Sequence, residues 1–214
     1  MKDIKYGRQD VNEADIDAVI SVLRSDWLTQ GPMGKMFEDR VAEYCGAKFA
    51  VSANSATSAL HIACLALGVN KGDYVWTSAN TFVASSNCAL YCGASIDFVD
   101  IDPCTYNLSV ECLSAKLSDA ERHGKLPKVV IPVHLNGLSC NMKEISDLSK
   151  KYGFKIIEDA SHAIGGKYLG EPIGNCAYSD IAIFSFHPVK IITTISMTAS
   201  TANEALNCQS IQRQ

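Results

Sequence analysis

The sequence predicts an α/β fold with a mainly parallel sheet and helices on both of its faces. Short apolar runs typical of strands alternate with segments whose apolar residues recur at helical spacing, and glycines follow several of the helical segments. Strands separated by helices of this length form βαβ units, which place neighbouring strands in parallel. We find no internal repeat and no linker, so we expect a single domain over residues 1–214.

The expected elements follow in order along the chain. The helices are expected over residues 12–24, 36–44, 56–67, 82–92, 110–117 and 142–152. The strands are expected over residues 49–51, 74–77, 96–99, 128–133, 155–157 and 181–186. Residues 201–206 resemble a capped helix start, so we expect a further helix to begin there.

Composition and charge narrow the class of protein. The chain has 214 residues, of which 47% are hydrophobic and 20% charged, and this profile is typical of a globular protein. The net charge of −4 is spread without a basic stripe, so we expect no nucleic-acid partner. No apolar run reaches the roughly 18–20 residues of a membrane span. Residues 1–6 do not resemble a secretory signal, and a cytoplasmic location is therefore expected.

The nine cysteines do not indicate a metal site. None forms a C-x-x-C pair, and most stand in apolar runs, such as those around Cys64 and Cys88. Free thiols of this kind are typical core residues of proteins in a reducing compartment. We therefore expect no bound metal.

Four segments place polar residues at the ends of expected strands, where ligands bind in open parallel sheets. The first, residues 52–60, runs from a strand end into a helix start. Its free backbone N–H groups and small hydroxyl side chains suit a phosphate group. The alternative is that Asn54 or Ser55 only caps the helix.

The second and third segments carry an aromatic ring and a carboxylate. Phe82 follows a strand end and can stack on a planar ring, although an aromatic residue at a helix start is more often part of the core. Asp159 ends the run 155–159, with His162 three residues later. A carboxylate there can keep a heterocyclic nitrogen protonated, or it can merely cap the next turn.

The fourth segment, residues 179–190, ends in a lysine. A buried strand leads to Ser185, and Lys190 stands among apolar neighbours, which favour the neutral, nucleophilic amine. The alternative is a surface lysine whose stem covers apolar residues. Taken together, a phosphate cradle, an aromatic, a carboxylate and a lysine are the groups that a pyridoxal phosphate site needs.

Several motifs resemble those of the DegT/DnrJ-type sugar aminotransferases. They are SANSATSALH, TSANTFVASSN, VVIPVHLNG, IIEDASHAIGG and SDIAIFSFHPVKIITT, and the resemblance runs from about residue 6 to residue 194. It implies the fold-type-I large domain of enzymes that use pyridoxal phosphate. The run FSFHPVK-x-ITT and the segments 28–31 and 54–60 are similar to the pseudaminic-acid branch. That branch aminates UDP-4-keto-6-deoxy-N-acetyl-β-L-altrosamine with L-glutamate as donor.

The resemblance also assigns roles to individual residues. It implies that Lys190 binds the cofactor as a Schiff base and moves the proton in a ping-pong transamination, and that Asp159 pairs with the pyridine nitrogen. Lysine also favours aminotransfer over sugar dehydration, because the related dehydratases have histidine there. The remaining cofactor contacts that it implies are His162, Ala56, Thr57, Phe82 and Ser185. The implied contacts to the nucleotide-sugar are Tyr6, Asp26, Trp27, Leu28, Thr29, Ala56 and Ser185.

The sequence departs from this pattern after Thr194. The family continues with a glycine-rich G-E-G-G turn, whereas residues 195–200 here read ISMTAS, as though a few codons were out of frame. We therefore expect residues 195–214 to form a divergent tail and the large domain to be incomplete. Members of the family are homodimers, and the same is expected of a complete protein.

Two other interpretations remain open from the sequence. The chain could be an inactive, truncated remnant of such an enzyme, or an aminotransferase for another nucleotide-sugar. A Rossmann-type dinucleotide oxidoreductase is a weaker alternative, because no G-x-G-x-x-G motif follows any expected strand.

Overall fold

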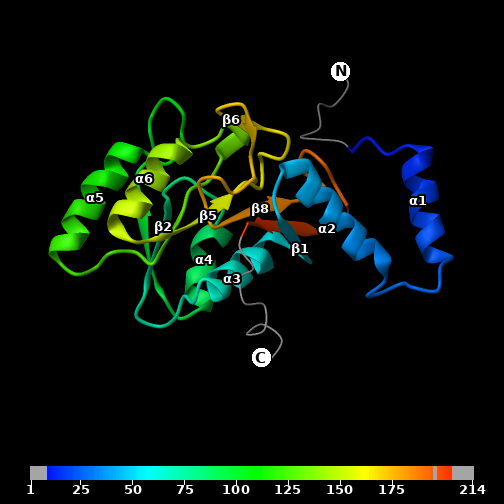
Figure 1. The fold of residues 1–214 in the computed structure, drawn as a ribbon, viewed down its shortest axis with the longest axis horizontal. Helices are drawn as coiled ribbons and strands as arrows, with labels where there is room; N and C mark the ends of the chain where they lie inside the picture. The colour runs from blue at the N-terminus through cyan, green and yellow to red at the C-terminus, as the bar shows by residue number, and fades with distance from the viewer. Residues whose placement is uncertain (1–8, 195–196, 204–214) are drawn as a thin grey trace, which may run out of the picture.

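The computed structural model describes residues 9–194 and 197–203, which Figure 1 shows as a sheet covered by helices. The main sheet has seven strands in the order β1-β9-β8-β5-β4-β2-β3. Its strands are β1 (Phe49–Ala53), β2 (Tyr74–Ser78), β3 (Ser95–Val99), β4 (Val129–Ile131), β5 (Lys155–Asp159), β8 (Ile181–Ser185) and β9 (Thr198–Ala202). The ladders that join β3, β2, β4, β5 and β8 are all parallel, which confirms the predicted sheet type. A separate antiparallel ribbon pairs β6 (Lys167–Tyr168) with β7 (Glu171–Pro172).

The predicted helices are confirmed, with shifts at some ends. They are α1 (Glu13–Leu23), α2 (Pro32–Cys45), α3 (Ala56–Ala66), α4 (Ala84–Tyr91), α5 (Val110–Arg122) and α6 (Met142–Tyr152), with a 3-10 turn η1 (Leu135–Gly137). The start of α2 is at Pro32 rather than Met36, because proline suits the first position of a helix. The end of α5 is at Arg122 rather than Leu117, because the last turn also buries Ala120.

Alternating side chains along the strands separate two cores. Ile157 of β5 packs with α3 and α4 on one face of the sheet, whereas Ile156 packs with α5 and α6 on the other. Successive residues of a strand point to opposite faces. Asp159 therefore shares the face of Ile157, toward α3 and α4, and Glu158 shares the opposite face. A third core joins α2 to Phe184 and Phe186 at the other end of the sheet.

The helix expected from Thr201 is wrong, because Thr201 and Ala202 belong to strand β9. This strand lies antiparallel between β1 and β8 and forms a ladder with each. As a strand, this segment satisfies its backbone N–H and C=O groups by pairing with both neighbours, and this outweighs the local preference for a helix cap. Ile195, Ser196 and residues 204–214 lie outside the described residues.

The apolar face predicted for the first helix forms but is not covered within the described residues. Asn12 caps α1, accepting the N–H groups of Ala14 and Asp15, and the helix buries none of its side chains. Val19 and Leu23 are both more than half exposed. Figure 1 shows α1 beside α2 and away from the sheet.

Two further properties concern the described residues as a set. None of their helices has the length and apolar character needed to cross a membrane. Their eight cysteines are all free thiols. Five of these are buried as predicted, whereas Cys104 and Cys112 are exposed and Cys92 is half-buried.

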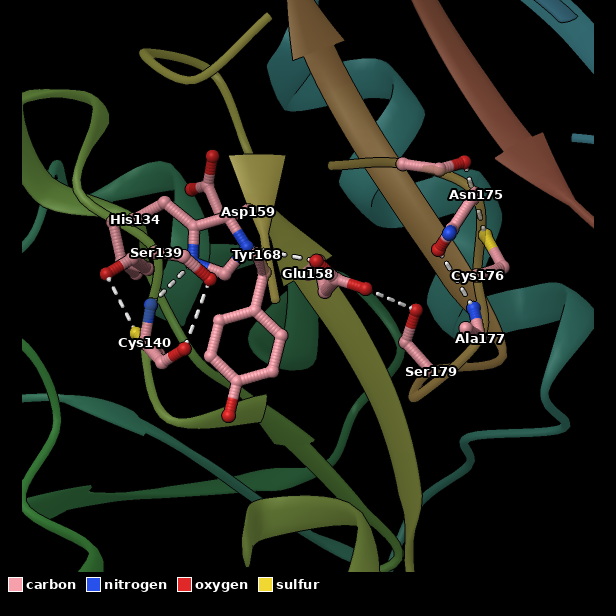
Figure 2. Close-up of polar contacts among 12 residues, drawn as sticks. His134, Ser139, Cys140, Glu158, Asp159, Tyr168, Asn175, Cys176, Ala177 and Ser179 are labelled. Carbon is pink, nitrogen blue, oxygen red and sulfur yellow. Dashed lines mark hydrogen bonds and ion pairs between the residues drawn. The ribbon is translucent and has the colours of Figure 1, made fainter. Parts of the chain in front are cut away.

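A buried polar network lies on the α5 and α6 face of β5. Figure 2 shows the Glu158 carboxylate between His134 and Ser179. The His134 Nδ1 atom accepts the Cys140 N–H at 3.1 Å, so the ring proton is on Nε2 and is donated to Glu158 at 2.7 Å. The Ser179 hydroxyl donates to the other Glu158 oxygen. These contacts satisfy a carboxylate that is only 5% exposed, and they tie strand β5 to the segment after β4 and to the loop before β8.

Removing one member of this network should destabilise the fold strongly. We predict that His134→Ala lowers the free energy of unfolding by about 3–5 kcal/mol, because the Glu158 carboxylate loses its buried partner. The exposed His123 offers a matched control, and His123→Ala should cost less than about 0.5 kcal/mol. Urea titration followed by circular dichroism measures both values. Equal losses in the two variants would contradict the role of the network.

Candidate active site

A cavity of about 350 Å³ opens at the carboxyl ends of the parallel strands. Its walls come from the start of α3, the segment before α4, the ends of β5 and β8, and the loops that follow those strands. The lining residues are Asn54, Ser55, Ala56, Thr57, Leu60, Thr81, Phe82, Ala84, Val133, Leu135, Asp159, Ser161, His162, Ser185, His187, Val189, Lys190 and Met197. All four segments singled out in the sequence therefore meet in one place.

Asp159 forms the floor of this cavity and is held on both sides. Its backbone N–H donates to the Pro132 carbonyl at 2.9 Å, and its carbonyl accepts the His134 N–H at 3.0 Å. Its carboxylate is 4% exposed. The Oδ2 atom accepts the Ser85 hydroxyl at 2.6 Å and Oδ1 accepts the Ser161 N–H at 3.2 Å. The carboxylate consequently has a fixed position.

The side chains of Lys190 and His162 contact each other in the cavity. The Lys190 Nζ atom lies 2.7 Å from His162 Nε2. Burial lowers the pKa of Lys190 below the ordinary lysine value, and the nearby Asp159 opposes this shift. Burial, followed by the charge of Lys190, lowers the pKa of His162, and Asp159 again opposes it. Both shifts favour the neutral bases, so one can donate a hydrogen bond to the other.

The start of α3 supplies backbone donors to the cavity. Ser55 caps the helix and its hydroxyl accepts the Ser58 N–H, so the cap predicted as the alternative does form. The N–H groups of Ala56 and Thr57 belong to the first turn, where a helix has no partners of its own for them. Ser185, at the end of β8, also lines the cavity. The cap and an anion-binding helix start are therefore compatible here.

Phe82 lies at the cavity wall, just before α4 begins. Its side chain is 72% exposed, so it does not belong to the core as the alternative reading proposed. On the opposite side of the cavity, Gly137 of η1 lies close to the backbone of the loop that carries His162. Gly137 has φ +88°, and a Cβ there would lie 2.9 Å from the His162 carbonyl oxygen. Glycine thus lets η1 pack against the loop that carries His162.

Part of the predicted set does not line this cavity. Asp26, Trp27, Leu28 and Thr29 lie between α1 and α2, and Trp27 is 58% and Leu28 70% exposed. Their role as nucleotide-sugar contacts stays a prediction. Tyr6 lies outside the described residues.

The sequence reasoning missed Ser85, the hydroxyl that contacts Asp159. Thr81 lies before the start of α4, so helical spacing gave no signal for Ser85, and the contact with Asp159 joins residues 74 positions apart. His187 and Ser161 also line the cavity and were not singled out. Within the part of the chain that the structure describes, no group of three or more His, Cys, Asp or Glu side chains is placed to hold a metal ion.

Several curated relatives of this chain are named as aminotransferases of nucleotide-linked sugars. It is 42% identical over 200 residues to a UDP-4-amino-4,6-dideoxy-N-acetyl-beta-L-altrosamine transaminase of Campylobacter jejuni, a match that covers 94% of this chain and 51% of the relative. It is 36% identical over 206 residues to a UDP-4-amino-4-deoxy-L-arabinose–oxoglutarate aminotransferase of Shewanella sediminis, covering 96% of this chain and 51% of the relative. The chain thus spans about half the length of the relatives it matches.

Solved structures agree with this comparison. Helicobacter pylori PseC, described as an aminotransferase of pseudaminic acid biosynthesis, superposes with a TM-score of 0.87 at 30% identity over 95% of this chain and 53% of that one. The PLP form of the putative sugar aminotransferase Spr1654 of Streptococcus pneumoniae superposes with a TM-score of 0.84 at 31% identity over 97% of this chain and 55% of that one.

The match to a known family covers all of the described residues. Residues 9–205 match the DegT/DnrJ/EryC1/StrS aminotransferase family, and this range contains every segment that lines the cavity. It also contains β9, so the departure after Thr194 does not end the match. The chain belongs to the DegT/DnrJ/EryC1/StrS aminotransferase family.

Proposed function

We propose that this chain is the cofactor-binding part of a pyridoxal phosphate-dependent nucleotide-sugar aminotransferase. The complete protein would transfer the amino group of L-glutamate to C4 of a UDP-linked 4-keto-6-deoxy sugar in pseudaminic acid biosynthesis. The observation that carries the proposal is one cavity lined by a lysine of lowered pKa, a buried carboxylate and a helix start. Residues 1–214 are then one incomplete large domain.

The residues present fit pyridoxal phosphate. The start of α3 offers N–H groups and a partial positive charge to a phosphate. Each Asp159 carboxylate oxygen accepts one hydrogen bond and retains a further lone pair for a pyridine N–H. The neutral form of Lys190 is the nucleophile that an aldehyde requires. These three features match the phosphate, the pyridine nitrogen and the aldehyde of the cofactor.

The proposed roles follow from these positions. Lys190 would hold the cofactor through its ε-amine and later carry a proton to and from the substrate carbon, while His162 orients that amine. Asp159 would keep a proton on the ring nitrogen. Bound pyridoxal phosphate supplies an electron sink for the carbon that gains or loses the amino group.

The remaining contacts complete the proposed cofactor site. Ala56, Thr57 and Ser185 would bind the phosphate, and Phe82 would stack on the ring. Ala56 and Ser185 would also contact the nucleotide-sugar, together with Tyr6 and the segment 26–29.

The choice of sugar rests on the named relatives. Two altrosamine transaminases of Campylobacter jejuni strains, at 42% and 43% identity, support the pseudaminic-acid branch. A second candidate is another nucleotide-sugar, because the relatives named for L-arabinose and GDP-perosamine are 36% and 37% identical. The inactive remnant is the outcome to exclude by experiment.

Assembly and location form the last part of the proposal. The exposed apolar side chains that follow the lysine, Ile191 and Ile192, adjoin the cavity residue Val189 and support a homodimer of the complete protein. The free thiols fit a reducing compartment such as the cytoplasm.

Cofactor binding tests the proposal first. We predict that the chain mixed with pyridoxal phosphate develops a visible absorbance band, and that borohydride fixes a pyridoxyl group on Lys190. Lys190→Ala should lose the band, because no other amine faces the cavity among its lining residues. Lys167→Ala, at an exposed lysine of β6, is the control. Peptide mapping that places the group elsewhere would contradict the assignment.

The pH dependence of cofactor capture tests the lysine itself. Only the neutral amine reacts, so the capture rate should rise with pH and level off above the pKa of Lys190. Since that pKa is lowered from 10.5, the half-maximal rate should fall below pH 10.5. Nα-acetyl-lysine in solution, with an ordinary pKa of about 10.4, provides the reference. A midpoint for the Lys190 peptide equal to the reference would refute the shift.

Amino transfer separates an active enzyme from a remnant. The chain loaded with pyridoxal phosphate should release 2-oxoglutarate from L-glutamate and then aminate UDP-4-keto-6-deoxy-N-acetyl-β-L-altrosamine, as measured by mass spectrometry. Lys190→Ala should slow the release of 2-oxoglutarate by on the order of 10³-fold, because it removes the proton carrier. A loaded chain that releases none is an inactive remnant. Amination of a GDP-linked 4-keto-6-deoxy sugar instead would favour the second candidate.

A further inference from the structure

Two hydroxyl side chains, Ser85 in α4 and Thr81 just before it, connect to the Asp159 carboxylate. Ser85 is fully buried in α4 and its Oγ lies 2.6 Å from Asp159 Oδ2. Thr81 lines the cavity and precedes α4 in the chain, and its Oγ1 atom lies 2.9 Å from Ser85 Oγ. The three side chains therefore form a continuous chain of hydrogen bonds from the cavity wall to the carboxylate.

The chemistry of the groups fixes the direction of this chain. An ionised carboxylate only accepts, so the single proton of the Ser85 hydroxyl is donated to Asp159. The Ser85 oxygen then accepts the proton of Thr81. Hydrogen bonds to an anion are short and strong, and a hydroxyl that itself accepts a bond is a better donor. Both contacts therefore hold the Asp159 carboxylate in one orientation.

The position of Ser85 follows from the strand. Asp159 shares a sheet face with Ile157, which packs against α3 and α4, and Ser85 is the residue of α4 that reaches the carboxylate. The titratable groups on the cavity side are Lys190, His162 and His187. Glu158, the next carboxylate along β5, points to the other face and is bonded there to His134.

We propose that Ser85 is a positioning residue for the proposed cofactor site, and that Thr81 and Ser85 act as a hydrogen-bond relay that keeps the Asp159 carboxylate aimed at the cofactor ring. This inference rests on the proposed function, since it concerns the carboxylate that would hold a proton on the ring nitrogen. Ser85 itself does not line the cavity and acts through Asp159.

The test compares two neighbouring serines. Ser85→Ala removes the donor to Asp159, whereas Ser86→Ala removes a buried hydroxyl of the same helix that donates only to the Val83 carbonyl. Both variants are titrated with pyridoxal phosphate between pH 5 and pH 9, and binding is followed by visible absorbance. The Lys190, His162, His187 and phosphate titrations are common to both variants, so the difference between them isolates the Asp159 contact.

We expect Ser85→Ala to weaken pyridoxal phosphate binding by about tenfold and to move the acidic limb of binding up by roughly one pH unit. The reason is that a carboxylate without its hydrogen-bond donor takes up a proton more easily. Ser86→Ala should match the unmodified chain in both respects. Ser85→Thr, which keeps the hydroxyl, should restore the position of the limb.

A second variant covers the case in which Ser85→Ala does not fold. Thr81→Val has nearly the same shape and removes only the donor to Ser85, so it should move the acidic limb in the same direction by a smaller amount. Thr81→Ser should leave the limb in place. Circular dichroism of the unloaded proteins shows which variants are folded.

The outcomes separate this inference from the proposed function. If the unmodified chain binds no pyridoxal phosphate, the proposed function fails and this inference fails with it. If the chain binds the cofactor but neither Ser85→Ala nor Thr81→Val moves the acidic limb relative to Ser86→Ala, the relay alone is refuted. A shift in the expected direction that Ser85→Thr or Thr81→Ser reverses supports it.

Discussion

Asp159 is the last residue of strand β5. Its backbone is hydrogen-bonded to Pro132 and His134, which follow β4, and its side chain is turned toward α3 and α4. The rest of the site depends on this placement. The cavity receives one buried anion at its floor, and that anion opposes the lowering of the pKa of both Lys190 and His162. Because the carboxylate oxygens are each bonded, by Ser85 and by the Ser161 N–H, its orientation is fixed before any ligand arrives. Such preorganisation avoids the cost of ordering these groups on binding.

The two faces of β5 carry carboxylates with different roles: Glu158 belongs to a buried network and Asp159 lines the cavity. Glu158 turns away from the cavity into a buried network with His134 and Ser179, and this network joins the loops that carry the strand ends. Asp159, one residue later, turns toward the cavity. Two adjacent carboxylates therefore have different environments only because a strand alternates its side chains. The backbone bond from His134 to the Asp159 carbonyl connects the two arrangements directly.

Surfaces outside this core remain uncovered among the described residues. They are the apolar face of α1, the side chains of Trp27 and Leu28, and the apolar residues that follow Lys190, all of which are exposed. The chain spans about half of the length of its relatives, and exposed apolar surface of this kind is typical of interaction sites. The proposed cofactor site is thus lined by residues of this chain, including the predicted nucleotide-sugar contacts Ala56 and Ser185, whereas residues 26–29 lie outside the cavity.

What the sequence determined by itself was the six helices, six of the seven strands of the main sheet and the identities of the reactive groups. The spacing of apolar residues predicted the six helices and the parallel strands, and the polar strand ends indicated Asp159, His162, Ser185 and Lys190, because local patterns encode both. Only the tertiary structure decided the rest. The strand β9 formed where a helix cap was expected, since two unpaired sheet edges offered more hydrogen bonds than a helix start. The contact between Ser85 and Asp159 joins residues 74 positions apart, so no local pattern could reveal it.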